Sequence, residues 1–183
     1  MRVISGTARH RILVTPQGMN TRPTSDKIKE TLFNMLRESL YDARFLDLFA
    51  GSGQIGIEAL SEGAAFCAFC DNDPHSIRCI EKNLKTTGFS ERALVCRGNV
   101  ISALRSMEKL EPFDIVFMDP PYDKGLEKEV LSYLSGSGVI TADTLIVVEA
   151  SDDTPMDYVD GLGYELIREK RYRNNKHIFL ERS

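Results

Sequence analysis

Asp119, Pro120, Pro121 and Tyr122 are the residues whose types and spacing are best suited to chemistry. They directly follow residues 113–118, an apolar run of strand length that is rich in β-branched and aromatic side chains. Each proline lacks an N–H and fixes φ, so the strand must end there on a stiff backbone. A carboxylate and an aromatic ring are therefore predicted at the carboxyl end of a strand, the edge at which open α/β sheets bind ligands.

This combination suits the activation of a planar exocyclic amine, such as that of a nucleobase. Such an amine is a poor nucleophile because its lone pair is delocalised into the ring. The Asp119 carboxylate and the Pro120 carbonyl can accept hydrogen bonds from both N–H groups and direct the lone pair outward, while Tyr122 stacks on the ring. The alternative is a strand that ends in a proline turn and uses the Tyr for packing.

A glycine-rich loop lies between an earlier predicted strand and helix. Residues 47–56 contain the pattern G-x-G-x-x-G, and Asp71 follows Gly51 by twenty residues. The same pattern is typical of dinucleotide binding with the acid on a ribose hydroxyl, so a dehydrogenase is a serious alternative. Asp47 argues against it, because a carboxylate ahead of the glycines would repel a pyrophosphate but attract the ammonium and sulfonium charges of S-adenosylmethionine. We also find no role in hydride transfer for residues 119–122.

In the methyltransferase interpretation, Gly51 and Gly53 let the backbone approach the methionine part of the cofactor. Asp71 binds the ribose hydroxyls, and Asn99 hydrogen-bonds the adenine. The full set of predicted cofactor-binding residues is Asp47, Phe49, Gly51, Gly53, Asp71, Asn72, Asn99 and Val100.

From residue 44 onward, strands and helices alternate, which is typical of a parallel sheet covered on both faces. The predicted strands are 45–49, 64–70, 93–97, 113–118 and 145–149, and the predicted helices are 54–62, 74–87, 100–109 and 126–134. The chain then ends in a predicted antiparallel hairpin of strands 164–172 and 177–181. We expect one domain over residues 1–183, with 44–183 as its α/β core and 1–43 as an extension.

The extension is predicted to contain a hairpin and a helix. Residues 1–14 fit two short strands around a polar turn at 5–10, either as a basic hairpin or as a solvated charged edge. A helix begins near residue 24 or 25, and its buried face is predicted to comprise Ile28, Leu32, Met35, Leu36 and Leu40. Lys27 and Lys29 near its start are expected to be solvated.

Charge is divided unevenly along the chain. The formal net charge is −4, but residues 1–30 carry +4, residues 164–183 carry +3, and residues 31–163 carry −11. The acidic centre suits a small cationic ligand, while the basic ends are suited to RNA. Three N-terminal arginines are predicted to contact RNA beside the mouth of the active site: Arg9, Arg11 and Arg22.

The cysteines and the apolar runs bear on metal binding and location. Cys67 and Cys70 have C-x-x-C spacing but lie within an apolar run, and no second pair follows at zinc spacing. We therefore expect buried, reduced thiols and no metal site. No apolar run is long enough to span a bilayer, and residues 1–6 lack the apolar core of a signal peptide. The sequence predicts a cytoplasmic protein with no membrane partner.

The chain resembles the RsmD family of bacterial small-subunit (16S) ribosomal RNA guanine-N2 methyltransferases over nearly its full length. The resemblance lies in residues 4–6 with the basic hairpin, 21–26 running into 29–34, 47–53, 56–60 and 119–122. The fold that it implies is the Rossmann-like, doubly wound sheet of S-adenosylmethionine-dependent methyltransferases, with seven strands of which the last is antiparallel. Two residues depart from the family pattern: Asn99 stands where Asp is common, and His10 stands where Gly is usual.

The resemblance implies S-adenosylmethionine as methyl donor and the N2 amine of a guanine as acceptor. The partner would be 16S ribosomal RNA in the small ribosomal subunit or its assembly intermediate, and we expect the enzyme to be a monomer. Two alternatives remain open. One is an N6-adenine methyltransferase acting on DNA or RNA, because residues 119–122 would serve any exocyclic amine. The other is a non-catalytic RNA-binding assembly factor that keeps the fold.

Overall fold

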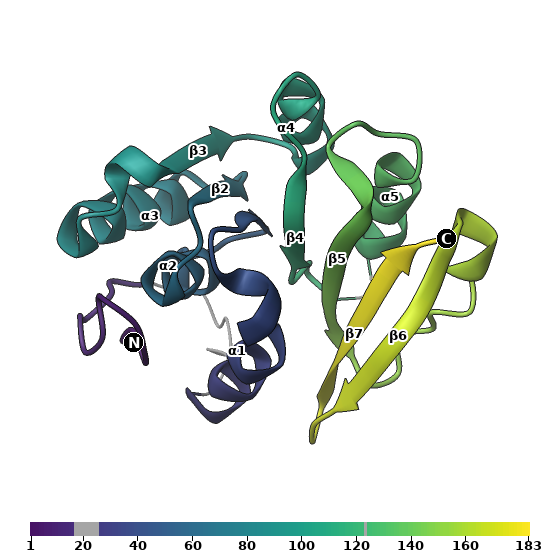
Figure 1. Ribbon diagram of the computed structural model, residues 1–183, viewed down its shortest axis with the longest axis horizontal. Helices are drawn as coiled ribbons and strands as arrows, with labels where there is room; N and C mark the ends of the chain where they lie inside the picture. The colour runs from purple at the N-terminus through teal and green to yellow at the C-terminus, as the bar shows by residue number, and fades with distance from the viewer. Residues whose placement is uncertain (17–25, 123) are drawn as a thin grey trace.

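Seven strands form one sheet in the order β3-β2-β1-β4-β5-β7-β6 (Figure 1). The computed structural model describes residues 1–16, 26–122 and 124–183. The strands are β1 (Arg44–Leu48), β2 (Phe66–Asp71), β3 (Ala93–Arg97), β4 (Phe113–Met118), β5 (Ile140–Ser151), β6 (Tyr164–Arg171) and β7 (Asn175–Arg182). Strands β1 to β5 pair in parallel, whereas β7 is antiparallel to both β5 and β6. The predicted doubly wound sheet with an antiparallel last strand is confirmed.

Helices cover both faces of the sheet (Figure 1). The helices are α1 (Asp26–Leu40), α2 (Gln54–Glu62), α3 (Pro74–Thr87), α4 (Val100–Met107) and α5 (Leu126–Leu134), with short 3-10 turns η1 (Ser90–Arg92) and η2 (Asp160–Leu162). One apolar core joins α1, α2 and α3 to the sheet, and a second joins α4 and α5 to its other face. Both faces of the central strands are therefore buried, as their continuous apolar runs require. In the part of the chain that the structure describes, no helix is both long and apolar enough to cross a bilayer.

Strand β5 is longer than the predicted 145–149, because it begins at Ile140. The sequence at 141–144 is polar and resembles a loop, but Thr144 Oγ1 donates a hydrogen bond of 2.7 Å to the Phe113 carbonyl and so attaches this stretch to β4. The pairing with β4 shifts register at that point. Strand β7 also begins earlier than predicted, at Asn175, so the connection that joins it to β6 is shorter. Tertiary pairing lengthens both strands beyond their apolar segments.

The predicted N-terminal hairpin forms as a short one, without strands of regular length. Arg2 and Ile12 make an antiparallel bridge, the Val3 N–H donates to the Arg11 carbonyl and the Leu13 N–H to the Met1 carbonyl, both at 3.0 Å, and the turn between them also bonds to α2. The backbone of Thr7 donates to the Ser61 carbonyl at 2.8 Å, and that of Ala8 donates to Ser61 Oγ at 2.9 Å. Gly6 permits this approach, because a Cβ at that position would lie 1.9 Å from the Ser61 carbonyl oxygen. The N-terminal segment is thus held both by its own cross-strand hydrogen bonds and by contacts with α2.

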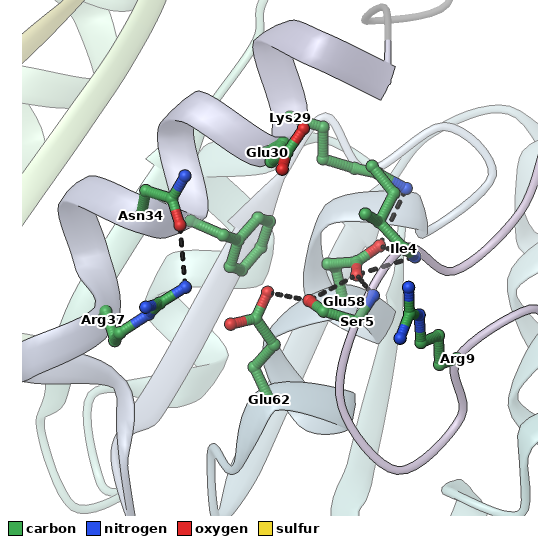
Figure 2. Close-up of a pocket in the computed structure, with 10 residues that line it drawn as sticks. Ile4, Ser5, Arg9, Lys29, Glu30, Asn34, Arg37, Glu58 and Glu62 are labelled. Carbon is green, nitrogen blue, oxygen red and sulfur yellow. Dashed lines mark hydrogen bonds and ion pairs between the residues drawn. The ribbon is translucent and has the colours of Figure 1, made fainter.

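A buried ion pair fixes this segment to two helices (Figure 2). Lys29 of α1, which the sequence predicts to be solvated, is 0% exposed, and its Nζ lies 2.8 Å from Glu58 Oε2 on α2. The same ammonium group donates to the Arg2 carbonyl at 2.8 Å. The Glu58 carboxylate accepts backbone hydrogen bonds from Ile4 at 2.9 Å and from Ser5 at 2.7 Å. Both charges are therefore compensated by groups far apart in sequence.

We predict that Lys29→Met lowers the free energy of unfolding by about 3–5 kcal/mol, because it leaves the Glu58 carboxylate buried without its cation. Urea unfolding followed by circular dichroism measures the change. Arg2→Ala is the matched control: its guanidinium pairs with Asp26 at 3.3 Å on the surface, and its loss should cost about 0–1 kcal/mol. Equal, small losses for the two variants would contradict an anchoring role for the buried pair.

Candidate functional site

Four carboxylates come together where four neighbouring strands end. Asp47 lies near the end of β1, Asp71 ends β2, Asp119 follows β4, and Glu149 lies near the end of β5. These strands are adjacent and parallel, with Leu48 of β1 opposite both Cys70 of β2 and Met118 of β4. Because parallel strands end at the same edge of a sheet, this edge concentrates negative charge where open α/β sheets bind ligands.

The loop between β1 and α2 turns sharply through left-handed backbone conformations. Phe49 has φ 62°, Gly51 has φ 57° and Gly53 has φ 75°. For the aromatic Phe49 this conformation costs of the order of 1 kcal/mol, and such strain is typical of functional sites. At Gly56 a Cβ would lie 2.3 Å from Phe69 Cε1, so only glycine lets α2 pack this closely on β2.

Two of the acids hold this loop in place. Asp71 accepts hydrogen bonds from the backbone N–H of Gly51 and of Asp73, both at 2.8 Å. Asp47, which is 2% exposed, accepts one from the Gly56 N–H at 2.9 Å. Burial raises the pKa of Asp47 to about 7. The hydrogen bond from Gly56 lowers this pKa, and the negative charge of Asp71 raises it further. Burial also raises the pKa of Asp71.

The loop after β3 lies beside Asp71. The Gly98 N–H donates to the Asp71 carbonyl at 3.0 Å. The Asn99 side-chain oxygen caps α4, accepting from the Ile101 N–H at 2.9 Å and from the Ser102 N–H at 3.4 Å. Because this cap needs only an oxygen, Asn serves as well here as the Asp common in the family. The cap uses the side-chain oxygen of Asn99, and the predicted adenine contact has to come from the remainder of this loop or from the amide nitrogen.

The other predicted cofactor residues lie around the same edge. Asn72 is exposed directly after Asp71, and Val100 is buried as the first residue of α4. Phe49 is half-buried at the end of β1 and packs toward the core on the α4 and α5 face. The structure therefore brings all eight predicted cofactor-binding residues to the carboxyl ends of β1 and β2 and to the segments that follow β1, β2 and β3.

The stretch from Asp119 to Tyr122 directly follows β4, as predicted. Asp119 is half-buried, Pro120 is buried, and Tyr122 is 44% exposed, so its ring is accessible from solvent. Burial, and then the charges of Glu149 and Asp47, raise the pKa of Asp119 well above its ordinary value. A cation or a hydrogen-bond donor bound here would therefore be strongly favoured.

Sequence reasoning missed a buried network behind Asp119. Glu149 is 4% exposed and accepts a hydrogen bond of 2.6 Å from Asn175 Nδ2. His177, which is 0% exposed, places Nε2 at 3.0 Å from Glu149 Oε2 and Nδ1 at 3.2 Å from the Tyr172 hydroxyl. One signal in the sequence was available: Glu149, like Asp71 and Asp119, comes at the end of an apolar strand run.

S-adenosylmethionine fits the chemistry of these residues. It carries ammonium and sulfonium charges, and the edge offers four carboxylates, of which Asp47, Asp71 and Asp119 form no ion pair with a Lys or Arg among the described residues. The buried Oε1 of Gln54, at the start of α2, also has no hydrogen-bond donor within the described part of the chain. An ammonium group supplies both a positive charge for the carboxylates and a hydrogen-bond donor for the Gln54 oxygen.

Two of the three arginines predicted to contact RNA are described, and neither lies at the strand ends. Arg9 follows the turn that bonds to Ser61, at the end of α2 remote from the glycine loop. Its side chain lines a pocket of about 260 Å³ that also contains Arg37 and Glu62 (Figure 2). Arg11 is exposed on the returning part of the same segment. Arg22 lies outside the described residues. Arg9 therefore lies by the end of α2 that is remote from the glycine loop, and its contact with RNA stays a prediction.

His10 takes up a left-handed conformation at φ 71° in this segment. Glycine adopts that conformation without a steric penalty, which accounts for the family preference at this position. Cys67 and Cys70 are buried free thiols on β2, and burial raises the pKa of Cys67 well above its usual range. Among the described residues, no group of three or more His, Cys, Asp or Glu side chains is arranged to hold a metal ion.

Comparisons with known proteins agree with this chemistry. A family model described as conserved hypothetical protein 95 matches residues 1–181. Ribosomal RNA small subunit methyltransferase D of Escherichia coli (strain K12) is 38% identical over 170 residues, which cover 93% of this chain and 84% of that protein. YlbH of Bacillus subtilis, provisionally named an rRNA methyltransferase, is 43% identical over 150 residues, which cover 81% and 82% of the two chains. The solved structure of yhhF from Escherichia coli, provisionally described as a methyltransferase, has a TM-score of 0.85 and 35% identity, covering 100% of this chain and 97% of that one.

We predict that Asp47→Asn stabilises the protein without ligand at neutral and alkaline pH. In the unfolded chain Asp47 loses its proton near pH 3.8, but in the folded protein it keeps it up to about pH 7. Stability therefore falls as pH rises between these two values, by about 1.4 kcal/mol per pH unit, and stays low above them. Asn keeps an acceptor for the Gly56 N–H but carries no charge, so it should raise the free energy of unfolding at pH 8 by about 2–4 kcal/mol.

Urea unfolding from pH 4 to pH 8 measures this effect. Asp143→Asn, at an exposed position on β5, is the control and should leave the pH profile of the wild type unchanged. If the free energy of unfolding of Asp47→Asn changes with pH in the same way as that of the wild type, ionisation of the buried Asp47 does not destabilise the protein.

Proposed function

The chain belongs to the RsmD family, and from the arrangement of its site we propose that it methylates the exocyclic N2 amine of a guanine in 16S ribosomal RNA. It is an S-adenosylmethionine-dependent ribosomal RNA methyltransferase. The observation that supports the amine as acceptor is the position of Asp119 and Tyr122 at the end of β4, between the acids of β1 and β5.

S-adenosylmethionine, when bound, supplies a methyl group on a positively charged sulfur. Asp71 would hold the ribose hydroxyls, and the loop around Gly51 and Gly53 would receive the methionine part. Asp47 supplies negative charge beneath that loop, where it also accepts the hydrogen bond that starts α2. These residues bind and orient the donor, so much of the rate arises from positioning.

We propose that Asp119 acts on the acceptor. Its carboxylate, with the Pro120 carbonyl, accepts hydrogen bonds from the two amine N–H groups and turns the nitrogen lone pair toward the methyl group. Tyr122 is exposed beside it and offers a ring on which the flipped base can stack. The rigid proline pair keeps the carboxylate and the ring at a fixed separation.

The RNA has to bring its target base to the strand ends around Asp119, and its neighbouring phosphates can contact other surfaces of the protein. We propose that Arg9 and Arg11 on the N-terminal segment bind RNA phosphates, in addition to Arg22. Support comes from the charge of +4 over residues 1–30 and from relatives named as small-subunit ribosomal RNA methyltransferases. The proposed partner is 16S RNA in the small subunit or its assembly intermediate, and the proposed setting is a cytoplasmic monomer.

We predict that Asp119→Ala lowers kcat about a hundredfold or more while binding S-adenosylmethionine. Loss of a hydrogen bond that is made to the reacting amine costs about 2–4 kcal/mol in the transition state. Transfer of a tritiated methyl group to naked 16S RNA and to assembling small subunits, followed by nucleoside analysis, measures both the rate and the product. Asp153→Ala, at an exposed position, is the control and should be fully active.

The product of the same assay separates the alternatives. If the product is N2-methylguanosine, guanine N2 is supported as the acceptor. If it is N6-methyladenosine, the protein is the alternative adenine methyltransferase. If the protein binds RNA but transfers no methyl group, it is the alternative assembly factor. Near-normal methylation by Asp119→Ala would contradict the assignment of the site.

We further predict that the double variant Arg9→Ala/Arg11→Ala weakens RNA binding and reduces its salt dependence. On single-stranded RNA the slope of log K against log salt should flatten by about 0.7 for each phosphate that an arginine no longer neutralises. Affinity for S-adenosylmethionine should stay unchanged, because the N-terminal turn contacts the far end of α2. A salt titration of RNA binding measures both quantities.

The control for this experiment is Arg171→Ala/Arg173→Ala on the C-terminal hairpin. Arg171 already pairs there with Glu169 and Asp152, so its charge is offset within the protein. If the N-terminal pair leaves affinity and slope unchanged, the N-terminal segment is an ordinary solvated edge and RNA docks elsewhere.

A further inference from the structure

Three polar side chains lie next to one another on neighbouring strands behind the reacting edge. Met118 of β4 pairs with Val148 of β5, so Asp119 and Glu149 follow at equivalent positions of adjacent parallel strands. Glu149 in turn pairs directly with His177 of β7. Side chains at paired positions point to the same face of a sheet, so the row Asp119, Glu149, His177 lies on one face.

The inner two members of this row are buried and hydrogen-bonded. Glu149 is 4% exposed and His177 is 0% exposed. Asn175 Nδ2 and His177 Nε2 lie 2.6 Å and 3.0 Å from the two carboxylate oxygens of Glu149. An ionised carboxylate can only accept hydrogen bonds, so His177 must carry its proton on Nε2. The other ring nitrogen, Nδ1, lies 3.2 Å from the Tyr172 hydroxyl.

This geometry keeps a negative charge at a fixed place beside Asp119. Two donors are directed at Glu149, and the ring of His177 is held between the Phe117 ring at 6.2 Å and the Tyr172 ring at 5.0 Å. The proposed function gives Asp119 hydrogen bonds to accept but assigns no role to Glu149 or His177. A buried acid with so complete a set of partners, directly beside the reacting carboxylate, needs a reason that packing alone does not supply.

We propose that Glu149, held by His177 and Asn175, is a positioning residue that makes Asp119 the proton acceptor of the methyl transfer. This proposal rests on the proposed function and adds to it the fate of the proton. The charge of Glu149 lies beside Asp119 and raises its affinity for a proton at the moment when the amine must lose one.

The proton balance of the reaction shows where this matters. The lone pair of the amine nitrogen becomes the new N–C bond, and the electron pair of the broken S–C bond returns to sulfur, which becomes a neutral thioether. The nitrogen then carries four bonds and a positive charge. It regains neutrality by giving one N–H proton to Asp119 Oδ, which becomes a neutral carboxylic acid and later releases the proton to water. An aspartate beside a second carboxylate is a stronger proton acceptor than an isolated one.

Few charged groups act on Asp119 within the described chain. They are Glu149 from β5 and Asp47 from β1. Around Glu149 itself lie Asp119, His177, Asn175 and Tyr172, and the charge of Glu149 contributes, after burial, to raising the pKa of Tyr172 to about 12. Tyr172 therefore stays a neutral hydroxyl at all pH values at which the enzyme would be assayed. Removing the charge of Glu149 changes the proton affinity of Asp119 without changing any group that touches the substrate.

The first test measures the titration directly and requires no turnover. Carbon-13 carboxyl resonances of the ligand-free wild type, Glu149→Gln and Glu165→Gln are followed by NMR from pH 3 to pH 9. In the wild type, Asp119 should titrate above the ordinary aspartate value of about 3.9. In Glu149→Gln its midpoint should fall by about one pH unit, because one neighbouring charge is gone. Glu165 is exposed on the edge strand β6, so Glu165→Gln should leave the midpoint unchanged.

The second test is the pH dependence of methyl transfer. The acid limb of the kcat profile should move to lower pH in Glu149→Gln, and kcat at pH 8 should fall about tenfold while the RNA KM stays constant. Glu149→Asp keeps the charge and should keep the acid limb near its wild-type position. A purely structural role would lower kcat equally at every pH and leave the position of the limb unchanged.

Two results would overturn the proposal. One is an Asp119 midpoint at the ordinary aspartate value in the wild type, which can be read even if Glu149→Gln does not fold. The other is a folded Glu149→Gln protein in which neither the Asp119 midpoint nor the acid limb moves. A wild type that shows the raised midpoint but transfers no methyl group to RNA would instead contradict the proposed function, so the two failures are distinguishable.

Discussion

Concentration of negative charge at one edge of the sheet is the constraint on which the rest of the structure depends. Parallel strands β1, β2, β4 and β5 deliver Asp47, Asp71, Asp119 and Glu149 to this edge, and burial raises the pKa values of the first three. A protein without ligand has to tolerate this repulsion. Within the described chain, backbone N–H groups donate to Asp47 and Asp71, and the side chains of Asn175 and His177 contact Glu149, rather than lysines or arginines. Hydrogen bonds satisfy the carboxylate oxygens but do not neutralise their charge. A cationic ligand is therefore attracted by negative charge that the protein itself leaves uncompensated.

The same constraint explains why much of the site could be predicted from the sequence. Asp47, Asp71 and Asp119 each follow or end an apolar run, and period and composition are enough to locate the end of a strand. The glycine loop added a local pattern that is needed for its left-handed turns. Glu149 has the same relation to β5, but no motif surrounds it, and its partners His177 and Asn175 come from a strand that pairs in the opposite direction. Only the pairing of β5 with β7 shows that they meet.

The features that the sequence did not predict all depend on contacts between distant residues. Lys29 is charged and lies in the first turns of α1, so pattern alone places it in solvent. It is buried because Glu58, twenty-nine positions later, and the Arg2 carbonyl together compensate its charge. The N-terminal segment shows the same effect, since Ser61 and Glu58 accept hydrogen bonds from its backbone and hold it on α2. Periodicity identifies which residues are apolar, but it does not identify which polar groups find a partner.

The N-terminal segment reaches from the glycine loop, where Ser52 Oγ donates to Met1 Sδ at 3.4 Å, to the far end of α2, where its turn bonds to Ser61, and this has a consequence for specificity. Under the proposed function, Asp119 and Tyr122 recognise an amine and an aromatic ring, features that several bases share, so contacts at this edge would select a class of atom rather than one nucleotide. Helix α2 spans nine residues, or roughly 13 Å at 1.5 Å per residue, between the glycine loop and the end that binds the turn before Arg9. RNA that reaches both ends of α2 must present its target base at a set distance and direction from its phosphates. Under the proposed function, selection of one guanine among many therefore depends on the shape of the RNA around it, and the buried Lys29–Glu58 pair, which fixes the N-terminal segment to the catalytic core, is what keeps that distance constant.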